Sequence, residues 1–491
     1  MRHPHHRPGP DPRRSLVVTL LLAAAGFLAA CSGTHPGGPL LETMGPQQSD
    51  TTQPASQREH QRIVAAYGGA YRDARLENSL AQIVDKLVAA SERPDLKYQV
   101  TILNSPAINA FALPSGQLYV TRGLIALAND TSELASVLSH EMAHVVARHA
   151  AMREDEARKA ALVNRVANDL LADPQLGALA LAKSKIALAS FSRAQEFEAD
   201  GIGVGISARA GFDPYGAQRF LTSMGLNAQL RARSANIDPR APDFLSSHPA
   251  TPERIANAQI NARQFTGPGS ALRDKTAYLS LIDGLTYGED PSEGFVRGRR
   301  FLHPKLGFTF TAPPGFTLDN TAQAVFGVKD GGGEALRLDV VQVPPEQALA
   351  AYLVSGWIEN IEPKSVEAIT ISGFPAATAT AGGDQWTFRL YVVRFGSDVY
   401  RFIFAAKNRT DAVDKTFRES IGSFRRMTLA EIRSAKPHRI KAVTVRAGDS
   451  VERLARRMAA HDHQVERFRV LNALKPGDRV KPGDVVKLVV D

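Results

Sequence analysis

Hydrophobic positions recur at helical spacing in the segment that follows Asp130. Glu133, three residues after Asp130, completes the spacing of a helix N-terminal capping box. With 3.6 residues per turn, the apolar residues of this segment fall on one side of a helix. This apolar stripe consists of Leu134, Val137, Leu138, Met142 and Val145. The pattern predicts an amphipathic helix that begins just after Asp130.

Two other regions show the two-residue alternation of β-strands. Residues 109–120 predict two short strands around a Pro-Ser-Gly turn. Residues 295–430 alternate over longer stretches, as in LRLDVVQV (336–343) and QWTFRLYVVRFGSDVYRFIFAA (385–406), with helical segments between and after them. The second region therefore predicts a separate α+β domain.

The start of the chain has the pattern of a secretory signal. A run of arginines precedes an apolar stretch at 16–30, which is too short to span a bilayer comfortably. The sequence Leu28-Ala29-Ala30-Cys31 resembles the lipobox of bacterial lipoproteins, which implies that Cys31 is lipidated and becomes the mature N-terminus. Ser32 stands where an inner-membrane retention signal would have Asp, so we expect a lipid anchor in the outer membrane, facing the periplasm. Residues 1–31 are the expected signal peptide, and the Gly/Pro/Ser-rich residues 32–57 are an expected tether.

Length and charge limit the remaining choices. A chain of 491 residues exceeds what one core usually supports, so we expect two or three domains. The formal charge is +9 and the pI near 9.6, but the basic residues are spread without a nucleic-acid motif, so we expect no nucleic-acid partner. A cationic face towards anionic envelope polymers or lipid headgroups explains the charge better. Cys31 is the only cysteine, which excludes an intrachain disulfide.

SHEMAH, residues 139–144, places candidate metal ligands on the predicted helix. His140 and His144 are four residues apart, so they differ by only about 40° around the helix and can bind one zinc ion. Glu141 projects beside them, where it could take a proton from an activated water molecule. On a continuous helix His149 would turn about 140° away from His144, so we expect it to be structural or surface and not a ligand.

Two histidines leave zinc short of a ligand, because catalytic zinc sites usually take three from the protein. The segment FSRAQEFEAD, residues 191–200, is the candidate source of an acid. Glu196 and Asp200 share a helix face, so one can reach the metal and the other can brace the first ligands. Glu198 points off that face, and we expect it to be structural.

Five ordered blocks in residues 62–262 resemble the HtpX, BepA and CAAX prenyl-protease group of zinc metallopeptidases, which are gluzincins with HExxH and a downstream Glu. The blocks are INAFALPSGQLYVTRGLI, ELASVLSHEMAHVVARH, SRAQEFEADGIG, AGFDP and SSHPATPERI. The resemblance implies one Zn²⁺ per chain, held by His140, His144 and Glu196, with Glu141 as general base and Asp200 bracing the ligands.

The same resemblance suggests roles for two residues of SSHPATPERI. His248 is a candidate donor to the oxyanion of the reaction, or alternatively a reversible inhibitory zinc ligand. Arg254 is expected to hold this segment against the site or to stabilise negative charge.

Substrate binding is expected at the strand that precedes the turn. In gluzincins an extended substrate pairs with a strand beside the metal, so Asn109 and Ala110 are candidate substrate contacts, with ordinary sheet residues as the alternative. The run 151–190 predicts helices over the site. No apolar run after the signal is long enough to cross a bilayer. No tetratricopeptide-type repeat follows, so the BepA arrangement is not reproduced.

The remaining regions carry weaker resemblances. Residues 295–430 resemble a PsbP-like α+β domain without a catalytic constellation. Residues 441–491 resemble a LysM module, which implies binding to peptidoglycan glycans, with Asp449 and Asn472 as candidate glycan contacts and turn formation or an anionic polymer as alternatives.

The expected fold class is α+β multidomain. A mainly helical gluzincin metalloprotease domain with a small β-sheet (58–265) precedes a linker (266–294), the PsbP-like domain (295–430) and a βααβ LysM-like domain (441–491). The expected function is a zinc-dependent metalloendopeptidase of the bacterial envelope that cleaves misfolded or misassembled proteins as unfolded or extended substrates. The alternatives are a non-catalytic chaperone or adaptor localised to peptidoglycan, and a peptidoglycan hydrolase.

Overall fold

The structure, a computed structural model, describes residues 54–155, 191–233, 248–265, 274–322, 324–383, 385–459 and 463–491. The expected signal peptide, Cys31, most of the expected tether and residues 156–190 of the expected covering helices lie outside this part of the chain. Two compact units are present. The discontinuous unit comprises Pro54–Asp290 and Lys436–Asp491, and the inserted unit contains Pro291–Ala435.

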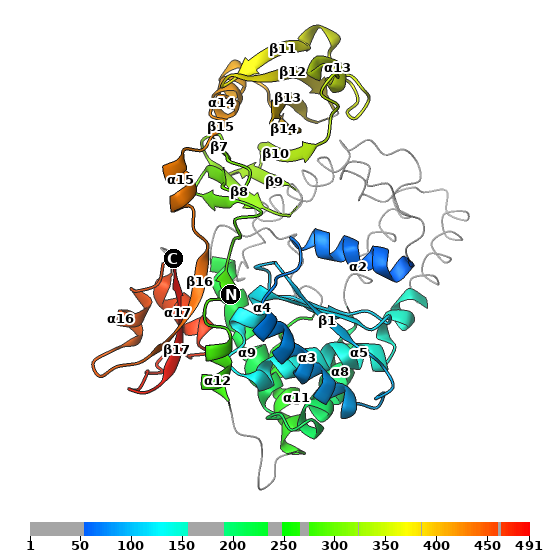
Figure 1. Cartoon of the computed structure of the whole chain (residues 1–491), viewed down its shortest axis with the longest axis vertical. Coiled ribbons are helices and arrows are strands. Elements are labelled where there is room, and N and C mark those ends of the chain that lie inside the picture. Colours follow the sequence, from blue (N-terminus) through cyan, green and yellow to red (C-terminus); the bar gives the residue numbers. More distant parts are fainter. Residues whose placement is uncertain are drawn as a thin grey trace, which may run out of the picture. The chain divides into compact units, whose positions relative to one another are not determined.

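The discontinuous unit is mainly helical and has two three-stranded sheets, β1-β3-β2 and β17-β16-β4 (Figure 1). Its helices are α2 (Ala55–Ala66), α3 (Ala74–Ala89), α4 (Arg122–Leu127), α5 (Thr131–Val146), α8 (Arg193–Arg209), α9 (Gly216–Arg233), α11 (Pro252–Arg263), α12 (Lys275–Leu281), α16 (Val451–Ala455) and α17 (Gln464–Leu471). Its strands are β1 (Gln99–Leu103), β2 (Ala110–Ala112), β3 (Gln117–Thr121), β4 (Thr286–Tyr287), β16 (His438–Thr444) and β17 (Val485–Val490).

Helix α5 begins as the sequence predicts. The Asp130 side chain accepts a hydrogen bond from the Glu133 backbone N–H at 2.9 Å, and the Glu133 carboxylate accepts one from the backbone of Asn129. Residues 132–144 are all buried, so α5 is enclosed on every side and runs through the centre of its unit. It ends at Val146, and Arg148 adopts a left-handed backbone conformation with φ 57°.

Helix α8 packs closely against α5 because of one glycine. A Cβ atom at Gly203 would lie 3.0 Å from both the Cα and the N of His140, so a larger residue would push the two helices apart. At its N-terminus α8 has a full capping box between Ser192 and Gln195. The backbone of α8 at Gly203 therefore lies against the middle of α5.

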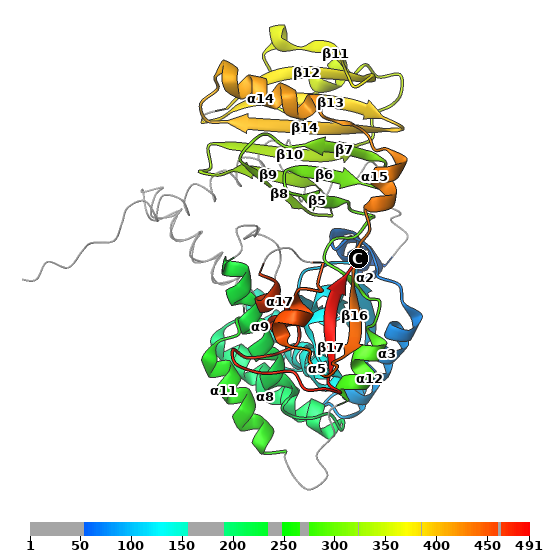
Figure 2. The same ribbon diagram turned by 90° about the vertical axis from the view of Figure 1, so that its left-hand side faces the viewer.

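The segment 436–491 shares a hydrophobic core with the rest of the discontinuous unit, and both views show β16 and β17 beside α12 and α17 (Figure 1, Figure 2). Strand β16 pairs with β4 through His438 and Arg439. From β17, the fully buried Lys487 donates through Nζ to the carbonyl oxygens of Ala126, Leu127 and Ala128, at the end of α4. This cation satisfies the C-terminal carbonyls of the helix that leads into α5.

The inserted unit confirms the expected mixture of alternating strands and helices. It has a seven-stranded antiparallel sheet, β11-β12-β13-β14-β10-β9-β8, and a four-stranded sheet, β15-β7-β6-β5. The strands are β5 (Phe295–Arg297), β6 (Arg300–His303), β7 (Phe308–Thr311), β8 (Phe316–Asn320), β9 (Val325–Lys329), β10 (Glu334–Val341), β11 (Glu367–Ile371), β12 (Phe374–Gly382), β13 (Thr387–Phe395), β14 (Asp398–Ala406) and β15 (Arg425–Arg426). The helices are α13 (Leu349–Leu353), the short 3₁₀ helix η1 (Pro363–Ser365), α14 (Asp411–Gly422) and α15 (Leu429–Ser434).

The two faces of the seven-stranded sheet carry different cores. Along β14, Phe402 and Phe404 join the core that includes Phe417 of α14, whereas Ile403 and Ala405 join the core that includes Leu353 of α13. Figure 2 shows α14 lying across the strands. Because both faces are covered, the strong aromatic alternation of this region is accounted for by packing.

Within the described residues, no helix combines the length and the apolar character that a membrane crossing requires.

Candidate metal centre

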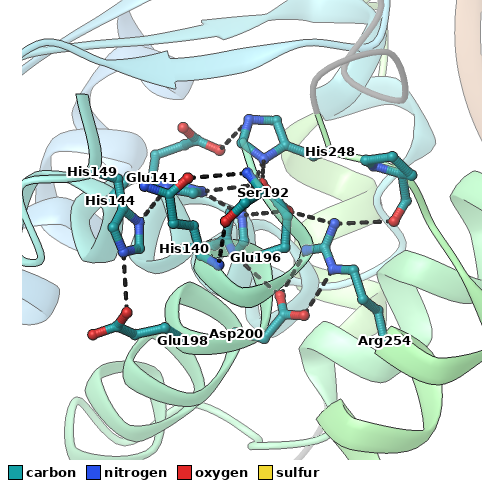
Figure 3. Close-up of polar contacts among 12 residues, drawn as sticks. His140, Glu141, His144, His149, Ser192, Glu196, Glu198, Asp200, His248 and Arg254 are labelled. Atoms are coloured by element: carbon teal, nitrogen blue, oxygen red, sulfur yellow. Dashed lines mark hydrogen bonds and ion pairs between the residues drawn. The ribbon is translucent and has the colours of Figure 1, made fainter. Parts of the chain in front are cut away.

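Helix α5 presents two histidines to the same point, as their spacing predicts (Figure 3). Nε2 of His140 lies 3.1 Å from Nε2 of His144, and both side chains are buried. Their rings meet edge to face, with centroids 4.7 Å apart. Two ring nitrogens this close leave room for a shared ion between them but not for two independent protonated groups.

Glu196 and His248 complete a group of four donors. Glu196, from the first turn of α8, places Oε2 3.5 Å from Nε2 of His140 and Oε1 3.6 Å from Nε2 of His144. His248, which precedes α11, places Nδ1 2.8 Å from Glu196 Oε1 and 3.3 Å from His140 Nε2. One atom from each of the four buried residues lies within 4.8 Å of the others.

These donors fit a zinc ion. A tetrahedral zinc with ligands at about 2.0–2.1 Å has neighbouring donors roughly 3.3 Å apart, which is close to the separations in this group. Imidazole and carboxylate are also the ligand types that zinc takes in catalytic sites. The expected ligands His140, His144 and Glu196 are thus brought together, and His248 joins them as a fourth donor.

Asp200 and Arg254 support the donors from behind. Asp200 lies one turn beyond Glu196 on α8, with Oδ1 3.1 Å from Nδ1 of His140. The Arg254 guanidinium donates to both oxygens of Asp200, at 2.7 and 2.8 Å, and lies 2.6 Å from Glu196 Oε2. It also donates to the carbonyl of Pro249, next to His248. One buried cation therefore links three of the segments that form the site.

The electrostatics of this pocket favour a bound cation. Burial opposes a charge on His140, but hydrogen bonds to Asp200 and Glu196 outweigh it and raise its pKa to about 9. Burial also opposes the Glu196 carboxylate, yet hydrogen bonds from His140 and His248 keep its pKa below the usual range. Burial, with His140 and His248 nearby, lowers the pKa of His144. A proton and a metal ion thus compete for the same donors.

Glu141 lies beside the donors without joining them. Its carboxylate is buried, and Oε1 has no hydrogen-bond partner among the described residues. Nε2 of His248 is 3.8 Å away. Burial raises the pKa of Glu141, which brings its proton affinity closer to that needed for a general base. An unpartnered buried carboxylate oxygen is costly, so a functional role explains its presence better than a structural one.

His149 does not turn away from His144, and the expectation that it does was wrong. Its side chain is fully buried, and its Nδ1 lies 2.8 Å from Nδ1 of His144 (Figure 3). The reason is that α5 ends at Val146, and the positive φ of Arg148 returns the chain towards the helix. His149 would turn about 140° away from His144 only if the helix continued to residue 149. His149 is nevertheless outside the group of four donors.

Phe191 is a site residue that the sequence reasoning missed. Its ring stacks on His144 with centroids 4.0 Å apart and planes 20° apart, and it lies 5.4 Å from the ring of His248. The Arg153 guanidinium lies over the ring of Phe191, 4.6 Å from its centroid. Phe191 opens the FSRAQEFEAD block just before the N-cap of α8, and that position beside a ligand helix was the available signal.

Of the candidate substrate residues, Ala110 opens the edge strand β2 and Asn109 directly precedes it. The Asn109 side chain is buried and donates to the Tyr67 hydroxyl at 2.9 Å, so it is already engaged. The backbone of Asn109 bonds to Thr121, and that of Leu113 to Gln117, which fixes the alternation along β2. The backbone groups of Ala110 and Ala112 therefore point away from β3, but Ala110 is buried and only Ala112 is partly exposed.

The candidate glycan contacts occupy structural positions. The Asn472 side chain is buried, donates to the carbonyls of Phe468 and Lys487, and accepts from the backbone N–H of Lys487. It ties α17 to β17. Asp449 accepts from the backbone N–H of Arg446 and closes the turn before α16, as the turn-forming alternative predicts.

Comparison with known proteins supports this interpretation of the site. Residues 74–262 match peptidase family M48. The beta-barrel assembly-enhancing protease of Escherichia coli (strain K12) is 34% identical over 189 residues, which is 37% of this chain and 37% of that protein. The mitochondrial metalloendopeptidase OMA1 of Schizosaccharomyces pombe (strain 972 / ATCC 24843) is 33% identical over 177 residues, 36% of this chain and 50% of that protein. This chain thus spans half or less of these relatives' lengths.

The solved structures that this chain resembles have lower sequence identity to it than these relatives do. The cyanobacterial PsbP protein of Synechocystis sp. PCC 6803 is 18% identical, with a TM-score of 0.23, covering 28% of this chain and 98% of that one. Such a score supports no conclusion about the inserted unit, so its PsbP-like fold stays a prediction, as does the LysM-like fold of residues 441–491.

The buried donors on α5 and α8, the general-base position beside them and the matched segment agree with one another. Residues 74–262 match the M48 peptidase family, and they contain the buried donor group that fits a zinc ion.

Proposed function

We propose that this protein is a zinc-dependent endopeptidase of the bacterial cell envelope, which cleaves misfolded or misassembled proteins. The observation that carries the proposal is the convergence of four buried donors beside a buried Glu141 with an unpartnered oxygen. A binding scaffold that had lost catalysis would have no use for the general base.

In the proposed reaction the protein residues have distinct tasks. When bound, zinc polarises the scissile carbonyl and lowers the pKa of water. Glu141 accepts a proton at Oε1 and delivers it to the leaving amine, a task that its raised pKa suits. Arg254 and Asp200 keep Glu196 and His140 in place, so the donors need no reorganisation during the reaction.

The position of His248 favours the inhibitory-ligand alternative for the state described here. Its Nδ1 is directed at Glu196 and His140, within the donor group, and so occupies the position that substrate or water needs. We propose that His248 leaves this position when substrate binds, and that Nε2, now 3.8 Å from Glu141, is then free to act as the oxyanion donor.

The edge of β2 that faces away from β3 suggests how a substrate binds. The outward backbone groups of the partly exposed Ala112 can pair with an extended peptide, and the pairing reaches the buried Ala110 once the groups that cover it move aside; such pairing selects unfolded or exposed segments with little side-chain preference. The name of the Escherichia coli relative refers to β-barrel assembly. We therefore propose outer-membrane proteins that fail to assemble as the substrate class.

Localisation is part of the proposal. A lipid on Cys31 would anchor the protein to the outer membrane, and residues 441–491 would bring it to peptidoglycan. Since the Asn472 side chain is buried and satisfied, any glycan contact must come from other, exposed groups of that segment.

One comparison separates the candidate functions. The purified mature chain and its Glu141→Gln variant are incubated with casein and with cell-wall sacculi. Casein cleavage that the variant lacks supports the proposal. Intact casein, or release of muropeptides from sacculi instead, would refute it in favour of the chaperone or the hydrolase alternative.

A further inference from the structure

Each of the two histidines on α5 has an outer partner on its second ring nitrogen. For His140 the partner is Asp200, which Arg254 holds in place. For His144 the partner is His149, whose other ring nitrogen, Nε2, lies 3.3 Å from Oε2 of Glu198 on α8 (Figure 3). His149 is fully buried, whereas the Glu198 side chain is 58% exposed.

The direction of the hydrogen bonds follows from the donor group. Nε2 of His144 faces His140 and Glu196, so it must keep its lone pair to bind a metal. The proton of a neutral His144 is then on Nδ1, and Nδ1–H donates to Nδ1 of His149. His149 in turn carries its proton on Nε2 and donates it to the Glu198 carboxylate.

We propose that His149 and Glu198 form a positioning relay that fixes the tautomer and ring orientation of His144. The inference rests on the proposed metal-dependent function. It assigns roles to two residues that are not among the four metal donors. The left-handed Arg148 is what allows the relay, because it brings His149 back beside the helix that it has just left.

Packing alone does not account for this arrangement. An apolar side chain would fill the same space beside Phe191, whose ring centroid is 6.2 Å from that of His149. Burying the polar imidazole of His149 costs desolvation free energy that an apolar side chain would not. A role in orienting His144 explains why an imidazole is present.

The test compares zinc affinity in four variants by competition with a chromophoric chelator. His149→Phe fills the space but cannot accept a hydrogen bond, whereas His149→Asn places an amide oxygen near the position of Nδ1. Loss of an outer partner typically costs 10–100-fold in metal affinity, so we expect that loss for His149→Phe and substantial recovery in His149→Asn. Glu198→Ala should show a smaller loss, and Arg193→Ala, an exposed change on the same helix, none.

The absorption spectrum of the cobalt(II)-loaded proteins provides a second measurement, since it reports on ligand geometry without turnover. We expect it to change in His149→Phe and to return in His149→Asn. Equal zinc affinity in wild type and His149→Phe would overturn the relay, as would equal losses in the Phe and Asn variants. Because Glu198 is exposed, Glu198→Ala tests the relay even where a buried substitution fails to fold, and unchanged affinity there also refutes it. Failure of the wild type to bind zinc would instead refute the proposed function.

Discussion

Replacing Lys487 by methionine removes one buried charge and keeps a side chain of similar length. Nζ of Lys487 donates to three carbonyl oxygens, at 2.7 Å from Ala126, 3.1 Å from Leu127 and 2.8 Å from Ala128. Burial lowers the pKa of this amine to about 7, but three carbonyl acceptors match the three N–H bonds of an ammonium group and favour its charged form. Methionine removes this donor from the carbonyls of Ala126 and Ala128, whereas the carbonyl of Leu127 still accepts from the Asn129 side chain at 3.0 Å.

The expected loss follows from the cost of breaking a buried charged contact. Each hydrogen bond to a charged group contributes about 1.5–3 kcal/mol, but the three share one nitrogen and do not simply add. Leaving a buried carbonyl without its partner costs about 1–3 kcal/mol, and with two carbonyls affected we expect the free energy of unfolding to fall by roughly 2–4 kcal/mol in Lys487→Met. Lys441→Met is the control. Lys441 lies on the neighbouring strand β16 in an exposed pair with Asp283, which contributes less than about 1 kcal/mol.

Urea unfolding measured by two signals locates the effect. The chain has two tryptophans, Trp357 and Trp386, and both lie in the inserted unit, so their fluorescence follows that unit. Far-UV circular dichroism is weighted towards the helices of the discontinuous unit. We expect Lys487→Met to shift the dichroism transition and not the fluorescence transition. Equal dichroism midpoints in Lys487→Met and Lys441→Met would show that the buried contact contributes nothing.

Three further changes test other parts of the structure. Gly203→Ala should destabilise the discontinuous unit by about 1–3 kcal/mol and weaken zinc binding, because the added Cβ would press on His140. The control Gly201→Ala should stabilise α8 slightly, since its Cβ meets only Asn261, at 3.7 Å. Similar stabilities and zinc affinities in the two variants would contradict this. Arg254→Lys should reduce zinc affinity about 10–100-fold in a chelator competition, because lysine cannot hold both oxygens of Asp200, and an unchanged affinity would dismiss that support. Burial lowers the pKa of His303 to about 4, so this residue should not reduce the stability of the inserted unit above about pH 6.5 and should cost it up to roughly 3 kcal/mol as the pH falls towards 4. Urea unfolding followed by tryptophan fluorescence at several pH values measures this loss. An equally steep pH dependence in His303→Asn would rule out His303 as the cause.

Helical periodicity was enough to predict which side chains share a face within α5 and within α8, and the family resemblance implied that the two faces meet. His140 and His144 share a face for reasons of spacing alone, and the i, i+4 pair Glu196 and Asp200 divides its tasks as that spacing suggests. What spacing could not supply was the place where a helix stops. The left-handed backbone at Arg148 reverses the position of His149, and nothing in the HVVARHA pattern distinguishes that turn from another helical residue.

Long-range packing was the second limit. Asn472 was a candidate glycan contact because it follows a helix in a LysM-like pattern, but its amide is consumed by bonds to Phe468 and Lys487. Equally, a lysine within the apolar run VVKLVV reads as an exposed position on an edge strand. Only the path of the chain shows that the end of α4 lies opposite Lys487 and needs a cation.

The discontinuity of the unit that holds the metal donors has a consequence for biosynthesis. Helices α5 and α8 leave the ribosome long before β17, because the whole of Pro291–Ala435 is made in between. Until residue 490 has emerged, the end of α4 lacks the Lys487 amine, and the core lacks Val486, Leu488 and Val489. We therefore expect a growing chain to carry an incomplete hydrolytic centre. Under the proposed function, such a delay would keep an active protease from forming before the chain is exported.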